Sequence, residues 1–246
     1  MTELQRSLEL DPAIQTVEVK ITAQVHDEEK VRRALERSGE KPEDRKVFFF
    51  DTPDLALFDA GIVLRARQIS GDTDDSTVKL RPVEPTELSE AWKKTSGFEV
   101  EIDGVGDKMI CSAKLSTDQK RGEIEAVAAG DRQIRKLFTA TQEKLLEEHG
   151  PAGVTWEDLT VLGPVDVHKW KIEPRGFDEE VTAEEWTLPD GSDLIELSIK
   201  VDPKHADAAS TEFMSFLDQH GFTTEGEQQT KTRAALTFFT GGEGFA

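Results

Sequence analysis

Charged side chains that recur in one phase along short apolar segments are the residues of this sequence that could do chemistry. Arg and Lys bind phosphate oxygens through charge-assisted hydrogen bonds, and Glu carboxylates hold Mg²⁺ or Mn²⁺, which bridge phosphate oxygens in turn. A site that combines both residue types suits a polyphosphate with a divalent metal. Six segments carry such residues: Glu18/Lys20, Arg65/Arg67, Lys79/Arg81, Glu99/Glu101, Lys169/Lys171 and Glu196/Lys200.

The spacing of these charges places each set on one face of a strand, because alternate residues of a strand point to opposite faces. In the segment 16–25, for example, Val17, Val19 and Ile21 share one face and Glu18 and Lys20 the other. One interpretation is a sheet whose polar face meets water. The other is a closed barrel with the charged faces turned inward and the apolar faces packed outward against helices. The pattern alone leaves both open.

Period-two segments typical of strands alternate with helical segments along the whole chain. Strands are expected at 16–25, 46–51, 62–69, 76–82, 98–102 and 168–173, in a hairpin that turns at 189–191, and last around 230–239. Helices are expected at 27–38, in a short turn ended by Gly61, over about 107–149 and at 211–222. Without a linker rich in Pro, Gly or Ser, we expect one domain over 16–240 with tails at 1–15 and 241–246.

Composition excludes several classes of protein. The chain has 246 residues and a net charge of −20, which argues against binding nucleic acid, since that needs clustered Lys and Arg. No apolar run approaches the roughly 20 residues that cross a bilayer, and the N-terminus lacks the apolar region of a secretory signal. We therefore expect a cytoplasmic protein that binds neither nucleic acid nor a membrane.

Other candidate residues are better explained by structure than by chemistry. Cys111, the single cysteine, falls in the expected helical middle and is predicted to be a packed or surface residue rather than a nucleophile. The five histidines lack the spacing of metal ligands. The four tryptophans are predicted to pack in the core or at its rim. The segment DGVGD at 103–107 is interpreted as a turn.

Several of these segments together resemble the CYTH domain, also called the triphosphate tunnel metalloenzyme superfamily. The resemblance runs from about Thr16 to Leu236, and its most specific part is the run FFFDTPDLALFDAGIVLRAR at 48–67. It implies an α+β fold: an eight-stranded antiparallel closed β-barrel flanked by helices, which holds a triphosphate and one or two divalent metals. The superfamily includes thiamine triphosphatases, inorganic triphosphatases and one class of adenylyl cyclases.

The resemblance also implies roles for individual residues. Catalytic roles fall to Lys20 and Glu101, and metal binding falls to Glu18, Glu196 and Glu184. The substrate-binding set consists of basic residues: Lys20, Arg65, Arg67, Lys79, Arg81, Lys171 and Lys231.

The sequence departs from the family pattern at two carboxylates. Thr16 stands where the family has the first Glu of its opening motif, and Ser198 stands where it has the second Glu of its late pair. The basic set is intact, so we expect Mg²⁺ or Mn²⁺ to bind weakly until a triphosphate is present. The function expected is metal-dependent hydrolysis of inorganic, thiamine or nucleoside triphosphate by a monomer or homodimer. The alternatives are a non-catalytic polyphosphate or nucleotide binder and, ranked below it, an adenylyl cyclase.

Overall fold

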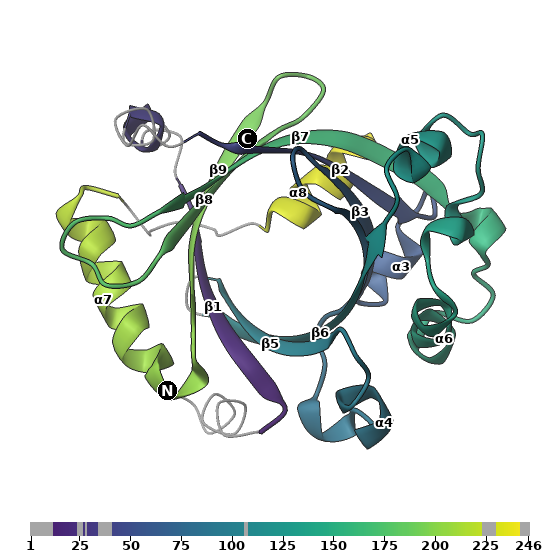
Figure 1. Ribbon diagram of the computed structural model, residues 1–246, viewed down its shortest axis with the longest axis horizontal. Coiled ribbons are helices and arrows are strands. Elements are labelled where there is room, and N and C mark those ends of the chain that lie inside the picture. Colours follow the sequence, from purple (N-terminus) through teal and green to yellow (C-terminus); the bar gives the residue numbers. More distant parts are fainter. Residues whose placement is uncertain are drawn as a thin grey trace.

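Nine strands form one closed sheet in the computed structural model of the chain (Figure 1). The structure describes residues 12–23, 27, 29–33, 41–105, 108–222 and 230–241. Around the barrel the order is β1-β5-β6-β4-β3-β2-β7-β8-β9, and β9 pairs with β1 to close it. The strands are β1 Ile14–Thr22, β2 Glu43–Asp51, β3 Ile62–Ile69, β4 Asp74–Leu80, β5 Phe98–Val105, β6 Lys108–Gln119, β7 Thr160–Ile172, β8 Val181–Thr187 and β9 Asp193–Val201.

The expected closed α+β barrel with flanking helices is confirmed, but the strand number and one pairing were wrong. The barrel has nine strands rather than eight, and β1 runs parallel to β5, whereas the other neighbours pair antiparallel. The number eight comes from the resemblance, whereas the period-two pattern itself lists nine strands. Two segments differ from that pattern, one a strand where a helix is expected and one a helix where a strand is expected, and these two changes leave the number of strands unchanged.

The first segment is β6, which replaces the start of the helix expected over about 107–149. Its residues alternate: Cys111, Ala113 and Leu115 are buried in the apolar core, and Lys114 and Ser116 face the barrel interior. Strand pairing on both sides overrides the weak helical pattern, because β6 lies between β5 and β4. The helices of this region are short: α5 Glu123–Ala128, η2 Ile134–Leu137 and α6 Ala140–His149, followed by η3 Trp156–Asp158.

The second segment is α8, Lys231–Phe239, which was expected to be a strand. Thr230 caps this helix by accepting a hydrogen bond from the backbone N–H of Arg233 at 3.3 Å. Ala234, Ala235 and Leu236 are strong helix formers and are all buried. Local propensity and packing on one side therefore favour a helix here.

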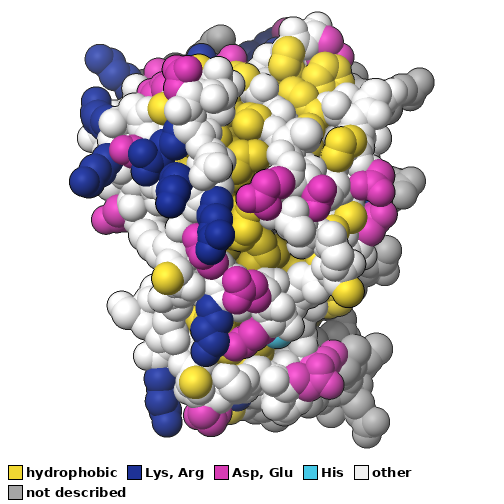
Figure 2. Space-filling model, turned by 90° about the vertical axis from the view of Figure 1, so that its right-hand side faces the viewer, with side chains coloured by type: hydrophobic (Ala, Val, Ile, Leu, Met, Phe, Trp, Pro, Cys, Tyr) yellow, Lys and Arg dark blue, Asp and Glu magenta, His cyan; other side chains and the backbone are white. Residues whose placement is uncertain are grey.

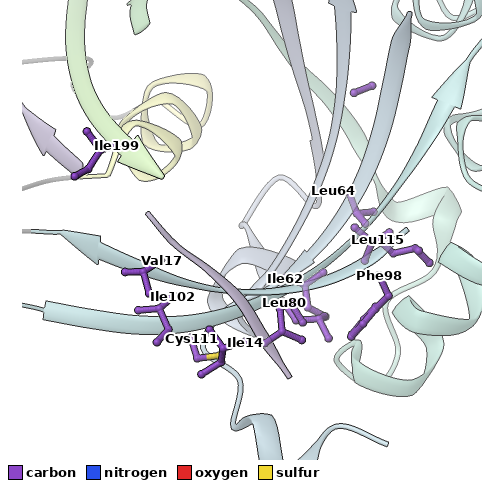
Figure 3. Close-up of a cluster of buried hydrophobic side chains, with 14 of the residues drawn as sticks. Ile14, Val17, Ile62, Leu64, Leu80, Phe98, Ile102, Cys111, Leu115 and Ile199 are labelled. Carbon is purple, nitrogen blue, oxygen red and sulfur yellow. The ribbon is translucent and has the colours of Figure 1, made fainter. Parts of the chain in front are cut away.

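Two apolar clusters hold the described part of the molecule together. The larger one lies outside the barrel, between the outward faces of the strands and helices such as α6 and α7, Ala206–Gln219. Figure 3 shows part of it, where Cys111 lies near Ile14 and Ile102. Phe213 of α7 is fully buried there, so the amphipathic helix expected at 211–222 is confirmed with an earlier start.

The smaller cluster fills one end of the barrel interior. Val47, Val167 and Trp186 share the inward phase of the charged residues on their strands, and they pack with Ala235 and Leu236 of α8. Helix α8 thus closes the barrel on the side of β2, β7 and β8 (Figure 1).

The segment between β2 and β3 is fixed by Asp51, the last residue of β2. Its carboxylate accepts backbone hydrogen bonds from Leu57 and Phe58, both at 2.9 Å, and so attaches α3, Ala56–Asp59, to the end of the strand. Gly61 then adopts φ +80°, which glycine tolerates best, and β3 begins at the next residue, as predicted. This turn sets the register that carries the two β3 arginines into the barrel.

The remaining elements connect or cover the barrel. The predicted hairpin at 189–191 is confirmed between β8 and β9, and the backbone N–H of Leu188 donates to the carbonyl of Ser192 at 2.8 Å. Residues 27 and 29–33 of the helix expected at 27–38 are helical, and the rest of it lies outside the described residues. Other short helices in the described ranges are η1 Pro85–Glu87, α4 Glu90–Lys93 and η4 Pro203–His205.

Candidate active site

A cavity of about 580 Å³ occupies the barrel interior and collects the charged strand faces. The barrel interpretation of the alternating charges is therefore correct, and the water-facing sheet is excluded. All eleven residues to which the resemblance assigns a role line this cavity: Glu18, Lys20, Arg65, Arg67, Lys79, Arg81, Glu101, Lys171, Glu184, Glu196 and Lys231. The other three members of the alternating pairs, Glu99, Lys169 and Lys200, line it too.

The cavity is positively charged although the protein is acidic. Its lining holds eleven Lys and Arg side chains against seven Glu side chains, an excess of four positive charges in a chain of net charge −20. Asp103 and Asp75 lie behind the lining and pair with four of these cations, so the excess is two when they are counted. The outer face in Figure 2 differs, with acidic side chains spread over much of it and most basic ones toward one edge. Fields inside a low-dielectric cavity are focused, so the interior attracts anions that the outer surface repels.

Three carboxylates form a compact group on β1 and β5. The carboxylate oxygens of Glu18, Glu101 and Asp103 lie within 4.8 Å of one another. Asp103 is completely buried and also accepts a hydrogen bond from the hydroxyl of Ser112 at 3.0 Å. We call these three residues the carboxylate triad.

Lysines connect the members of the carboxylate triad. The Lys20 ammonium lies 2.7 Å from Asp103 and 3.0 Å from Glu18. Lys79 lies 2.8 Å from Asp103 and 3.1 Å from Glu101. Both ammonium groups therefore bridge two carboxylates, which is how buried charges avoid being unpaired.

This arrangement shifts the pKa values of the triad. Burial alone would raise the pKa of Asp103 and Glu101, but Lys20 and Lys79 beside Asp103 hold its pKa far below the usual range, and Lys79 and Lys114 do the same for Glu101. Burial would lower the pKa of Lys20, but Asp103 and Glu18 raise it well above its ordinary value. The triad is ionised at neutral pH.

A second ionic group lies across the cavity, on β8, β9 and α8. Glu184 and Glu196 are cross-strand neighbours that share the ammonium of Lys231, which contacts Glu184 and lies 2.8 Å from Glu196. The Trp186 indole N–H donates to Glu184 at 3.1 Å. Burial would raise the pKa of Glu184, but Lys231 lowers it far below its usual range.

Arg65 and Arg81 have donors without acceptors. The buried Nε of Arg65 and the buried Nε and Nη2 of Arg81 make no hydrogen bond to any described residue. Arg81 does have a charged neighbour, since its Nε lies 3.7 Å from the carboxylate of Asp103. Burial, followed by the charge of Arg67, lowers the pKa of Arg65 to about 10, so it remains protonated at neutral pH. By contrast, Arg67 donates from Nε to both carboxylate oxygens of Asp75, each at 3.0 Å.

Sequence reasoning missed three residues of this site. The segment DGVGD predicts a turn at Asp103, but β5 continues through this residue in the phase of Glu99 and Glu101. Lys114 was hidden by the helical interpretation of β6, although the alternation of 109–116 carried the signal. Arg45 also lines the cavity, because β2 begins at Glu43, three residues before the predicted start.

The two departures from the family pattern lie next to the carboxylate triad. Thr16 is the cross-strand neighbour of Glu101, and Ser198 is the neighbour of Lys20. Ser198 is buried. Neutral hydroxyls therefore stand where two more carboxylates would adjoin the triad.

The donor chemistry of the triad fits a divalent cation. Mg²⁺ and Mn²⁺ prefer carboxylate oxygens, and the spacing of these three groups brings one oxygen of each to a common centre. The predicted metal set of Glu18, Glu184 and Glu196 shares only Glu18 with the triad. Glu184 and Glu196 are engaged by Lys231 instead.

Comparisons with solved structures identify the fold. A candidate adenylate cyclase from Bacillus halodurans has a TM-score of 0.61 and 11% identity, over 89% of this chain and 96% of that chain. HpAC1 from Hippeastrum, a candidate adenylyl cyclase with a dominant triphosphatase activity, has a TM-score of 0.61 and 15% identity, over 93% and 97%. No family model and no curated protein matches the sequence. The chain therefore has the fold of the CYTH proteins that its sequence resembles.

None of the helices in the described ranges combines the length and the hydropathy that a bilayer span needs.

Proposed function

We propose that the cavity binds the triphosphate group of a small molecule and hydrolyses it with the help of Mg²⁺ or Mn²⁺. The observation that carries this proposal is the set of buried guanidinium N–H groups on Arg65 and Arg81 that lack acceptors. Unpaired buried donors are costly, and they surround a cavity with an excess of positive charge. A phosphate chain supplies the missing acceptors along its length.

The basic residues reach the cavity from different elements of the fold. Arg65, Arg67 and Lys79 lie on neighbouring strands β3 and β4, and Lys231 enters the cavity from α8. Such a set can contact several phosphoryl groups of one chain at once. The same contacts stabilise the charge that develops on the transferred phosphoryl group.

Lys20 and Glu101 keep their proposed catalytic roles, with different tasks. Lys20 lies between Glu18 and Asp103 and can place a positive charge beside a phosphoryl oxygen. The pKa of Glu101 is too low for it to take up a proton near neutral pH, so Glu101 acts by accepting a hydrogen bond from the attacking water and orienting it.

The carboxylate triad is the proposed metal site. A divalent ion bound there would neutralise phosphate charge and position the chain for in-line attack. The role of this protein's own residues is to present Glu18, Glu101 and Asp103 as oxygen ligands from adjacent strands.

A non-catalytic binder is the second candidate function. It is favoured by the lysine bridges across the triad and by the neutral Thr16 and Ser198 beside it, which together reduce the attraction for a cation. Such a protein would hold a polyphosphate or nucleotide without releasing phosphate.

The cyclase ranks below both because a nucleobase finds little free aromatic surface in the described cavity. The Lys231 ammonium lies over the Trp186 ring and the Arg233 guanidinium over the Phe58 ring, each 5.1 Å from the centroid. Both rings also belong to the apolar cluster beneath α8.

Phosphate release from a panel of triphosphates tests the proposal. Tripolyphosphate, thiamine triphosphate and ATP would each be incubated with the protein in Mg²⁺, in Mn²⁺ and in EDTA. We expect release with metal and none in EDTA. Calorimetric binding without release would select the non-catalytic function, and neither binding nor release of any of the three would refute both.

A further inference from the structure

The three carboxylates of the triad form a triangle, and each pair of them is an edge. The lysine on the third edge is more exposed than the lysines on the other two. Lys20 bridges Glu18 to Asp103, and Lys79 bridges Glu101 to Asp103. The remaining pair, Glu18 and Glu101, is bridged by Lys200 of β9, at 3.6 Å and 3.5 Å respectively. Each edge of the triangle therefore has one ammonium group on it.

This arrangement leaves no net attraction for a metal. The three carboxylates carry three negative charges and the three bridging lysines cancel them, before Lys114 is added 3.0 Å from Glu101. A divalent cation needs carboxylate oxygens that are free to coordinate it, and ammonium groups at these oxygens compete for the same lone pairs and repel the ion.

Lys200 is the bridge that can leave. Its side chain is 49% exposed, against 14% for Lys20 and 20% for Lys79, and its two contacts are longer than any that the other lysines make with the triad. Exposed ion pairs with long contacts contribute little to stability. A flexible lysine at the cavity wall can exchange carboxylates for phosphate oxygens at little cost.

We infer that Lys200 acts as a gate on the metal site. Its ammonium group bridges Glu18 and Glu101 until a phosphate chain draws it away. This inference rests on the proposed function, since the phosphate chain is the anion that moves Lys200. It makes the binding of the anion and of the metal mutually favourable, because each ligand favours the state in which Lys200 has left the edge. The replacement of two family carboxylates by Thr16 and Ser198 predicts weak metal binding, but it assigns no role to any lysine.

The test is Mn²⁺ binding to the full chain without any anion, measured by the electron paramagnetic resonance signal of free Mn²⁺. The variant Lys200→Gln removes the positive charge and leaves a polar side chain that is one atom shorter. We expect it to bind Mn²⁺ at least 10-fold more tightly than the wild type.

Lys171→Gln is the matched control. Lys171 also lines the cavity, is 62% exposed, and pairs with Glu180 at 3.0 Å rather than with the triad. It should leave Mn²⁺ affinity near the wild-type value. The double variant Lys200→Gln/Glu18→Gln should lose the gain, which places the metal at the triad.

Two outcomes would overturn the inference. An equal gain in Lys200→Gln and Lys171→Gln would mean that the general field of the cavity, not a gate, limits metal binding. No gain in Lys200→Gln would mean that Lys200 does not guard the site. The proposed function is tested separately, by calorimetry of tripolyphosphate binding in EDTA. The Mn²⁺ measurement uses no anion, so its result for Lys200→Gln does not depend on whether the protein binds tripolyphosphate.

Discussion

Arg65 differs from its neighbour Arg67 in having no carboxylate partner among the described residues. Arg67 is held by Asp75, whereas the Nε of Arg65 is buried without an acceptor. A buried charge of this kind is costly in the empty protein and is satisfied when an anion arrives. The guanidinium of Arg65 is therefore a hydrogen-bond donor that an anion in the cavity can satisfy.

Replacing Arg65 with Ala should weaken the binding of tripolyphosphate by roughly 10- to 150-fold, since a hydrogen bond to a charged group contributes about 1.5–3 kcal/mol. Calorimetry in EDTA measures this without interference from metal. Arg233→Ala removes the same charge from an exposed position on α8 outside the cavity lining and should change affinity little. Equal losses in the two variants would contradict a direct contact by Arg65.

Asp103→Asn should destabilise the fold by about 3–5 kcal/mol, because it removes a buried carboxylate and leaves the partly buried ammonium groups of Lys20 and Lys79 short of a counter-charge. Urea denaturation at pH 7 gives the free energy of unfolding. Asp166→Asn breaks an exposed pair with Lys46 at 3.8 Å and should cost less than about 1 kcal/mol. Similar costs for both variants would show that Asp103 is not the centre of the ionic group.

The depressed pKa of Glu101 makes part of the stability depend on pH. A carboxyl whose pKa is lower in the folded than in the unfolded state adds stability above the unfolded value, about 4.3, and this is lost as pH falls. Glu101→Gln lacks this contribution. The difference in unfolding free energy between the wild type and Glu101→Gln should therefore be largest at pH 7 and shrink toward pH 3. A difference that is constant over this range would contradict the low pKa.

The turn between α3 and β3 is the element that aligns the basic strands. Gly61 ends α3 with φ +80°, and its carbonyl accepts a hydrogen bond from the backbone N–H of Arg81 at 2.7 Å. A Cβ at this position would lie 2.6 Å from the carbonyl oxygen of Arg81. The close approach joins the ends of β3 and β4, which carry Arg65 and Lys79.

Gly61→Ala should therefore destabilise the protein more than Gly71→Ala. Both glycines have positive φ, so alanine costs about 1–2 kcal/mol at either position, but nothing lies within 4 Å of a Cβ at Gly71. The added clash at Gly61 should also displace Arg81 and weaken tripolyphosphate binding. Thermal denaturation and calorimetry of the two variants measure both effects, and equal melting temperatures would show that the turn tolerates a side chain.

At the scale of the whole molecule, the charge of the surface and the charge of the cavity have opposite signs. The chain has a net charge of −20, whereas the cavity lining has an excess of four positive charges. Repulsion among surface carboxylates opposes folding, and attraction inside the barrel favours anion binding. Salt screens both interactions.

Added NaCl should therefore raise the melting temperature while lowering the affinity for tripolyphosphate. The Debye length falls from about 10 Å at 0.1 M salt to about 3 Å at 1 M, which weakens repulsion on the surface and attraction at the cavity mouth. Melting curves and calorimetry over this range measure the two trends. A melting temperature that falls with salt would indicate that ion pairs, such as those of the carboxylate triad, outweigh the surface repulsion.

The sequence by itself determined which side chains face the barrel interior on most strands. A strand alternates strictly, so Glu18 and Lys20 or Arg65 and Arg67 share a face whatever the strand pairs with. The run at 48–67 also fixed the order of β2, α3 and β3, because Asp51 and Gly61 act on their near neighbours in the chain. These are local properties, and local properties can be read from spacing.

Only the tertiary structure decided what depends on pairing between distant segments. The alternation at 109–116 is compatible with a strand, but its place between β5 and β4 comes from closure of the barrel. Helix α8 is favoured locally, but only its packing places its alanines in the end of the barrel. Asp103 joined the site through its contacts with Lys20 and Lys79, which lie 83 and 24 residues away in sequence. The bridge by Lys200 arises in the same way, because barrel closure pairs β9 with β1 and β1 with β5. The spacing of residues along one strand does not predict these contacts. The groups that form them lie on different strands, and only closure of the barrel brings those strands together.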